Sequence, residues 1–292
     1  MSKLVLEPKE FRILEGLRIN PRKSFHGRVR GERLTKKKGL SIEFDDYREY
    51  SEGDDLRHLD WNILARLEHA VIKTYRDEED LAVHMLLDTS SSMSFGEPSK
   101  LDYARRLACA MGYVALCGGD AVYPRTLGSR QQPMAVIRGR SSYPRLAHWS
   151  NAPEPEGKLP LSQELKLFVA GGARPGVVMI ISDCMDPEIL TGLRMLAGRG
   201  HEVNVMQVLS EVELRPDLEG DLRLIDVESE SAVEITANSL TMRDYMSQLN
   251  NHNEAIAEEC RRLGGRYALI EVGTTIEQIV RDVLRREGWV AA

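Results

Sequence analysis

A short apolar run that stops abruptly at a polar turn constrains the fold more than any other feature of this sequence. The run, LAVHMLL, occupies residues 81–87, and the turn, DTSSSM, occupies residues 88–93. The run is too short to cross a membrane and apolar enough to form a strand that is buried on both faces. Apolar residues then return at helical spacing, at Leu101, Ala104, Ala108, Met111, Ala115 and Leu116. The pattern predicts a buried strand, a polar turn and an amphipathic helix, in that order.

Strands and helices continue to alternate along the rest of the chain. Further apolar runs at residues 177–181, 203–209 and 267–272 predict buried strands, and the segments between them show helical periodicity. This alternation is typical of an α/β fold with a doubly wound, mostly parallel sheet. Ligands of such sheets bind outside the carboxyl ends of the strands, where the winding direction switches.

The chain divides into three predicted regions. Residues 1–38 are expected to form an N-terminal helix and a basic arm, and residues 39–78 a β-rich segment. Residues 79–292 are expected to form the α/β domain, with a β-hairpin inserted near residues 221–236. A chain of 292 residues, of which 42% are hydrophobic, is long enough for one core and a smaller appended domain.

The charge distribution weighs against nucleic acid as the main partner. The formal net charge is -6, although residues 18–38 are strongly basic and residues 43–60 strongly acidic. Because phosphate binding depends on clustered cations, an overall acidic chain favours other partners. The basic arm leaves one alternative open, namely binding to an anionic surface or to nucleic acid.

The cysteines and the hydropathy pattern predict a cytoplasmic chain. The four cysteines form no C-x-x-C pair, which fits free thiols in a reducing compartment. No run approaches the roughly 20 apolar residues that a membrane-spanning helix needs. We therefore expect no membrane span.

The polar turn has the composition of a site for a hard cation. Asp88, Ser90 and Ser92 form a D-x-S-x-S group, whose alternate side chains can point their oxygens toward one position. Asp183 ends a second buried strand and is expected at the same edge of the sheet. Carboxylate and hydroxyl oxygens suit Mg²⁺, and a cation with so few protein charges would favour an acidic group of a partner. The alternative is a purely structural role, in which Asp88 caps the helix that follows the turn.

An upstream block is dense in arginine, aspartate and aromatic residues. Its pattern is R-x-Y-x-x-G-D-x-x-R-x-x-D-W, and its functional candidates are Arg48, Tyr50, Asp54, Arg57, Asp60 and Trp61. Arginine–carboxylate pairs at this spacing can close bidentate hydrogen bonds across a compact turn. The block is therefore either a self-contained scaffold of ion pairs or a surface that binds a partner.

Two of these motifs resemble known families. The D-x-S-x-S turn and Asp183 look like the metal-ion-dependent adhesion site of von Willebrand factor A domains. The upstream block resembles the family called domain of unknown function 58, and the resemblance covers most of the chain from about Gly39 onward. Genes of that family commonly neighbour MoxR-type AAA+ ATPases, which implies an adaptor or assembly factor that works with such an ATPase. Members often carry membrane helices, whereas this chain shows none.

The sequence departs from the adhesion-site pattern at one ligand. The pattern expects a threonine in the loop before the helix that precedes the second acidic strand, and here the corresponding segment, GKLPL, has Leu159. An apolar side chain cannot bind a metal. The resemblance therefore carries over to Asp88, Ser90, Ser92 and Asp183, without a fifth ligand.

An enzyme would have to use the same residues. Asp88 could accept a phosphoryl group or Ser90 an acyl group, as in a phosphatase or hydrolase. Phosphoryl-accepting sites usually have a second acid two positions on, where this chain has Ser90, and His84 lies inside the strand rather than beside the turn. The sequence contains no G-x-S-x-G, P-loop or H-E-x-x-H motif. We therefore expect a non-enzymatic interaction module.

Overall fold

The chain folds into two compact units. The computed structural model describes residues 6–25, 43–51, 54–76, 80–128, 134–152, 160–217, 220–225 and 232–292. Met1–Phe25 and Leu81–Ala292 form one unit, here called the α/β unit, and His26–Asp80 form the other, here called the small unit. The division differs from the expected boundaries, because the first 25 residues belong with the α/β unit.

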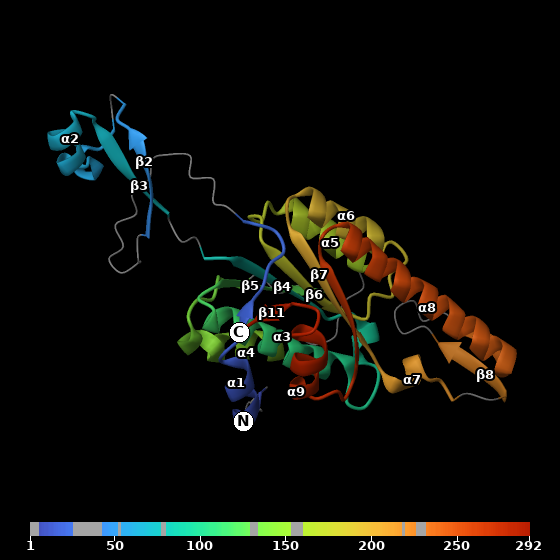
Figure 1. The fold of residues 1–292 in the computed structure, drawn as a ribbon. Coiled ribbons are helices and arrows are strands. Elements are labelled where there is room, and N and C mark those ends of the chain that lie inside the picture. Colours follow the sequence, from blue (N-terminus) through green and yellow to red (C-terminus); the bar gives the residue numbers. More distant parts are fainter. Residues whose placement is uncertain are drawn as a thin grey trace. The chain divides into compact units, whose positions relative to one another are not determined.

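A five-stranded parallel sheet forms the centre of the α/β unit (Figure 1). Its strands, in spatial order, are β10 (Arg266–Glu271), β7 (Glu202–Leu209), β6 (Val177–Ser182), β4 (Ala82–Asp88) and β5 (Ala121–Leu127). All four neighbouring pairs are parallel. Counted along the chain, this is the order 2-1-3-4-5 of doubly wound folds, whose switch point lies between β4 and β6. The predicted fold class is confirmed.

Helices cover both faces of the sheet (Figure 1). One face packs against α1 (Pro8–Leu14), α3 (Lys100–Cys117), α4 (Tyr143–Asn151) and α9 (Ile276–Ile279), which a π-helical turn over Val280–Leu284 extends. The other packs against α5 (Leu161–Ala170), α6 (Ile189–Gly198) and α8 (Ser239–Arg262). Side chains of β4 alternate between the two cores, so all seven of its residues are buried. Burial on both faces explains why the run is apolar throughout.

The N-terminal segment is part of the α/β core. Leu6, Leu14 and Leu17 are buried among the side chains that cover one face of the sheet. The short strand β1 (Arg18–Ile19) then pairs antiparallel with β11 (Val290–Ala291), next to the C-terminus. Because this pairing joins the two ends of the unit, helix α1 is anchored in the core.

The inserted hairpin and the N-terminal β-rich segment both occur as antiparallel pairs. β8 (Gly220–Ile225) pairs with β9 (Ala232–Ala237), which confirms the predicted insertion. In the small unit, β2 (Glu43–Glu49) pairs with β3 (Val71–Arg76). The unit also contains a 3-10 helix over Leu56–His58 and α2 (Trp61–Leu67).

A short apolar segment does not form the strand that its composition suggests. The apolar residues 134–137 suggest a strand, but Ile137 forms only an isolated antiparallel bridge with Val122 of β5.

Among the helices that the structure describes, none combines the length and the apolar character needed to cross a membrane.

Candidate functional site

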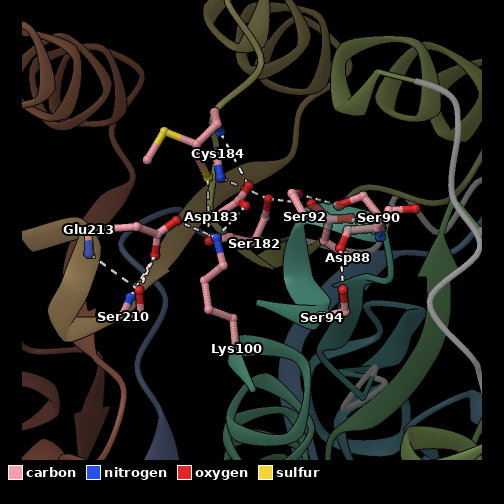
Figure 2. Close-up of polar contacts among 12 residues, drawn as sticks. Asp88, Ser90, Ser92, Ser94, Lys100, Ser182, Asp183, Cys184, Ser210 and Glu213 are labelled. Carbon is pink, nitrogen blue, oxygen red and sulfur yellow. Dashed lines mark hydrogen bonds and ion pairs between the residues drawn. The ribbon is translucent and has the colours of Figure 1, made fainter. Parts of the chain in front are cut away.

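The switch point of the sheet brings Asp88 and Asp183 to one edge. Asp88 is the last residue of β4, and Asp183 directly follows β6, the neighbouring strand. Both residues are buried, with exposed fractions of 4% and 3%. Ser90 and Ser92 lie beside Asp88, as Figure 2 shows. The four residues predicted from the sequence therefore lie at the edge where open α/β sheets bind ligands.

The Asp88 carboxylate is held by neutral hydrogen-bond donors. Its Oδ1 accepts the backbone N–H of Ser90 at 2.9 Å, and its Oδ2 accepts the hydroxyl of Ser182 at 2.5 Å. The hydroxyls of Ser90 and Ser92 lie 3.0 Å apart. Within the described part of the chain, no ion pair involves Asp88. A carboxylate and two hydroxyls thus lie together without a cationic side chain on the carboxylate.

Asp88 does not cap the following helix. The N-cap residue of α3 is Ser99, whose side chain accepts the backbone N–H of Asp102. The alternative role for Asp88 as a helix cap is therefore wrong. The reason is that a 3-10 turn over Ser91–Ser94 and the following loop separate Asp88 from the first turn of α3.

The Asp183 carboxylate, in contrast, is paired with a buried lysine. Lys100 is the first residue of α3 and only 2% exposed. Its Nζ lies 2.9 Å from Asp183 Oδ2 and 2.6 Å from Glu213 Oε1 (Figure 2). Glu213 lies in the short helix α7 (Glu211–Leu214), where its Oε2 closes a capping box with Ser210. Lys100 therefore bridges the edges of β6 and β7.

Sequence reasoning missed Lys100, Ser182 and Glu213. Lys100 carried a usable signal, because it lies four residues before Ala104 and so on the buried face of α3. A lysine in the first turn of a helix also opposes the helix dipole, which suggests that a nearby anion holds it there. The partners themselves are 83 and 113 residues away along the chain.

The pKa shifts at this edge follow from burial and from neighbouring charges. Burial and the charge of Asp183 raise the pKa of Asp88 to about 6, against the lowering effect of the bonds from Ser182 and Ser90. Burial alone would lower the pKa of Lys100, but Asp183 and Glu213 outweigh it and raise that pKa. The lysine is therefore a charged ammonium at neutral pH. Among the described residues at this edge, Asp88, Asp183 and Glu213 provide three carboxylates, and Lys100 provides one ammonium, which pairs with Asp183 and Glu213. The edge therefore keeps an excess of negative charge.

The donor set fits a hard divalent cation. Asp88, Ser90 and Ser92 offer carboxylate and hydroxyl oxygens, which are the ligands that Mg²⁺ prefers. Asp183 gives one oxygen to Lys100, and its other oxygen accepts a long 3.4 Å bond from Met185 N as its one hydrogen bond within the described residues. The described residues hold no group of three or more His, Cys, Asp or Glu side chains placed for a metal. The hydroxyls are thus essential to this donor set, and Leu159 lies outside the described residues.

The histidine weighed as a catalytic base lies in a different environment. His84 is buried in β4, where its Nε2 lies 2.9 Å from the carbonyl oxygen of Arg174. Its ring packs against the rings of Tyr123, Phe168 and His201. The hydroxyl of Ser90 bonds to Ser92 instead. Ser90 therefore has no histidine partner in this arrangement of the described residues.

In the small unit, the charged residues of the Arg48–Trp61 block pair mostly with one another. Arg48 donates to Asp54 at 2.7 Å, and Arg57 donates to Asp55 at 2.6 Å. Asp60 accepts the backbone N–H groups of residues 62 and 63 at the start of α2 and pairs with Lys73 at 2.9 Å. These contacts are those of an ion-pair scaffold.

The two aromatic residues of the block are exposed. The exposed fraction is 61% for Trp61 and 36% for Tyr50. Exposed aromatic residues are enriched where proteins bind partners. The block thus combines a charged scaffold with two exposed aromatic side chains, those of Tyr50 and Trp61.

Comparisons with known proteins place the chain in a family. The family model described as "Protein of unknown function DUF58" matches residues 46–255. Uncharacterized proteins from Mycobacterium tuberculosis and Mycobacterium bovis are 27% identical to it, over 98% of this chain and 92% of theirs. An aerotolerance-related membrane protein from Bacteroides fragilis has a TM-score of 0.45 and 17% identity, covering 70% of this chain and 99% of that chain. Proximal thread matrix protein 1 from mussel byssus has a TM-score of 0.31 and 14% identity, covering 44% and 38%.

Proposed function

We propose that this chain, which belongs to the DUF58 family of proteins of unknown function, is a non-enzymatic protein-interaction module. Its α/β unit binds an acidic group of a partner at the edge formed by Asp88, Ser90, Ser92 and Asp183, with a divalent cation between the two. The observation that carries the proposal is the buried Asp88 carboxylate, which lies beside two hydroxyls and whose hydrogen-bond donors among the described residues are all neutral.

Each residue has a separate task in this proposal. Asp88, Ser90 and Ser92 would hold Mg²⁺ directly, and Asp183 would add negative charge from the neighbouring strand. A bound Mg²⁺ keeps coordination positions open to water or to an incoming carboxylate. Ser182 donates to Asp88 and accepts the N–H of Cys184, so it orients the carboxylate from β6. This arrangement supports binding of an acidic partner rather than acyl transfer, because no histidine among the described residues lies beside Ser90 to act as its base.

The partner that we propose is a MoxR-type AAA+ ATPase, for which the chain would serve as an adaptor or assembly factor. This step rests on the resemblance of the chain to its family. The small unit offers a second contact through Tyr50 and Trp61, whose side chains are exposed although both are large and aromatic.

Affinity capture of the ATPase from a lysate of the source cells tests the proposal. The full chain would serve as bait with Mg²⁺ or with EDTA, as wild type and as Asp88→Ala. Ser92→Ala and Ser94→Ala form a matched pair, since the Ser94 hydroxyl bonds to the carbonyl oxygen of Ser91, outside the donor set. We expect Mg²⁺-dependent capture by wild type and Ser94→Ala, and its loss in Asp88→Ala and Ser92→Ala. Equal capture under all conditions would refute the metal-dependent mechanism.

A thermal melt gives an independent measure of Mg²⁺ binding. At about 100 times its Kd, a ligand that binds only the folded state stabilises it by about 2.7 kcal/mol. Wild type and Ser94→Ala should therefore melt at higher temperature when Mg²⁺ is added, and Asp88→Ala should not. A chain whose melting temperature ignores Mg²⁺ at every concentration would contradict the proposed cation.

A further inference from the structure

We propose that Lys100 sets the affinity of this edge for divalent cations, because it competes with the cation for the Asp183 carboxylate. The inference rests on the proposed function, and it assigns a positioning role to a residue that acts on the cation through Asp183. The geometry behind it is a buried ammonium that lies between two carboxylates, one directly after β6 and the other in helix α7, which follows β7.

The first step is that Lys100 already holds one oxygen of Asp183. The Nζ–Oδ2 distance of 2.9 Å is that of a charge-assisted hydrogen bond, and the side chains are 2% and 5% exposed. Water therefore screens this pair little. A second cation beside Asp183 would meet both a shared ligand and a neighbouring positive charge.

The second step is that Lys100 has another partner to which it can move. Glu213 Oε1 lies closer to Nζ than Asp183 does, at 2.6 Å, and it comes from a different segment of the chain. The position of Glu213 is fixed, because its Oε2 accepts both the N–H and the hydroxyl of Ser210 at 2.8 Å. The ammonium could thus stay buried and paired with Glu213 when Asp183 turns toward a cation.

The third step links this exchange to more distant parts of the α/β unit. The hydroxyl of Tyr245, in α8, donates to the backbone carbonyl of Glu213 at 2.9 Å. Gln207 of β7 donates to the carbonyl of Asp183 at 2.8 Å, which holds the backbone while the carboxylate remains able to turn. The two partners of Lys100 are therefore rigid at the backbone, and the exchange needs side-chain movement alone.

Titration calorimetry of the full chain with MgCl₂, repeated with MnCl₂, tests the proposal. Lys100→Met keeps the length of the side chain and removes its charge, so we expect the cation to bind about tenfold tighter or more, equivalent to about 1.4 kcal/mol. Lys166→Met is the matched control, because Lys166 is a surface lysine of α5, 42% exposed, and its substitution should leave the Kd unchanged. Asp183→Asn, alone and combined with Lys100→Met, separates competition for Asp183 from a general effect of charge.

If competition for Asp183 is the cause, the gain from Lys100→Met should fall below about threefold in the Asp183→Asn background. A folded Lys100→Met chain with the wild-type Kd would overturn the role of Lys100 and leave the proposed function standing. Absence of cation binding in every variant would overturn both. A gain of equal size in the Asp183→Asn background would overturn competition as its cause.

Glu213→Gln provides a second route if Lys100→Met does not fold. Without the charge of Glu213, the ammonium should remain on Asp183, and we expect the cation to bind at least threefold more weakly. Unchanged or tighter binding in Glu213→Gln would contradict the exchange of partners. Circular dichroism of each variant establishes that the comparison is between folded chains.

Discussion

Two groups of buried ionisable side chains, one near each end of the parallel sheet, are stabilised in opposite ways. Near the amino ends of the strands, His84 and His201 lie among aromatic rings, with their ring centroids 5.3 Å apart. At the carboxyl ends, Asp88, Asp183 and Lys100 form a cluster of hydrogen bonds and ion pairs. Both groups are almost fully excluded from water.

The difference lies in how each group avoids the cost of a buried charge. Burial lowers the pKa of His84 to about 4 and also lowers that of His201, so both rings are neutral at pH 7 and pack as part of the core. Lys100 stays charged because Asp183 and Glu213 raise its pKa. A buried charge persists where an oppositely charged side chain pairs with it, as Asp183 and Glu213 do for Lys100 and as Glu202 does for Arg266 near the amino ends of the strands. The histidine pair is thus part of the core packing, whereas the Lys100 cluster keeps its charges at the edge where we propose that the partner binds.

Removing the ammonium should produce the largest loss of stability. Lys100→Met leaves the buried Asp183 and the partly buried Glu213 without their cation, and breaking a buried ion pair by removing one partner costs about 3–5 kcal/mol. Urea denaturation in EDTA should therefore show a lower free energy of unfolding, and Mg²⁺ should restore part of it. A loss below about 1 kcal/mol would mean that the charges at this edge are less dependent on one another than the geometry indicates.

Acid should reveal the opposite behaviour at the amino end. The folded-state pKa of His84, about 4, lies below its ordinary value of 6.5, so its neutral form is favoured by folding. Its contribution is complete above pH 6.5 and is lost as pH falls toward 4, by about 3 kcal/mol in total. Urea denaturation at several pH values should thus show that the free energy of unfolding declines more steeply with falling pH for wild type than for His84→Phe.

The comparison with His84→Phe is needed because Asp88 changes the free energy of unfolding with pH in the opposite direction to His84. Its folded-state pKa, about 6, lies above the ordinary 3.8, so its contribution to stability is lost as pH rises through this range. Asp88 is present in both chains and cancels in the difference. Parallel pH profiles for wild type and His84→Phe would refute the neutral packing role of His84.

A smaller effect is expected in the small unit at Asp60, whose carboxylate accepts backbone N–H groups and pairs with a lysine. Asp60 caps α2 and pairs with Lys73. Asp60→Ala should speed amide hydrogen exchange in the first turn of α2 by about fivefold or more, since the cap is lost. Trp61→Ala should leave that exchange nearly unchanged and weaken capture of the partner. Equal amide exchange in both variants would remove the distinction between the charged scaffold and the exposed aromatic residues.

The sheet and its edge can be predicted from the sequence because they depend on local patterns. Strands β4 and β6 are apolar throughout, and the chain turns polar where each of them ends, at Asp88 and at Asp183. Parallel pairing of these two strands is enough to bring both carboxylates to one edge. Ser90 and Ser92 can be predicted as part of the site as well, because they follow Asp88 in the D-x-S-x-S pattern.

The partners of Asp183 and the place of the N-terminal segment could not be predicted in the same way. Lys100 meets its partners only through the tertiary fold, and a long-range ion pair has no local periodicity. Strands β1 and β11 contain two residues each, too few for a strand pattern. The helix at residues 8–14 is amphipathic, which is equally compatible with a separate arm and with packing on the core.

The burial of Lys100 also determines how this lysine reacts. Acylation of a lysine requires a neutral amine that the reagent can reach, and Lys100 is both charged and 2% exposed. Reagents and acetyl-transferring enzymes should therefore modify it only after the carboxyl edge opens, and later than exposed lysines such as Lys9 and Lys166. Its rate of acylation thus reports how often this edge opens.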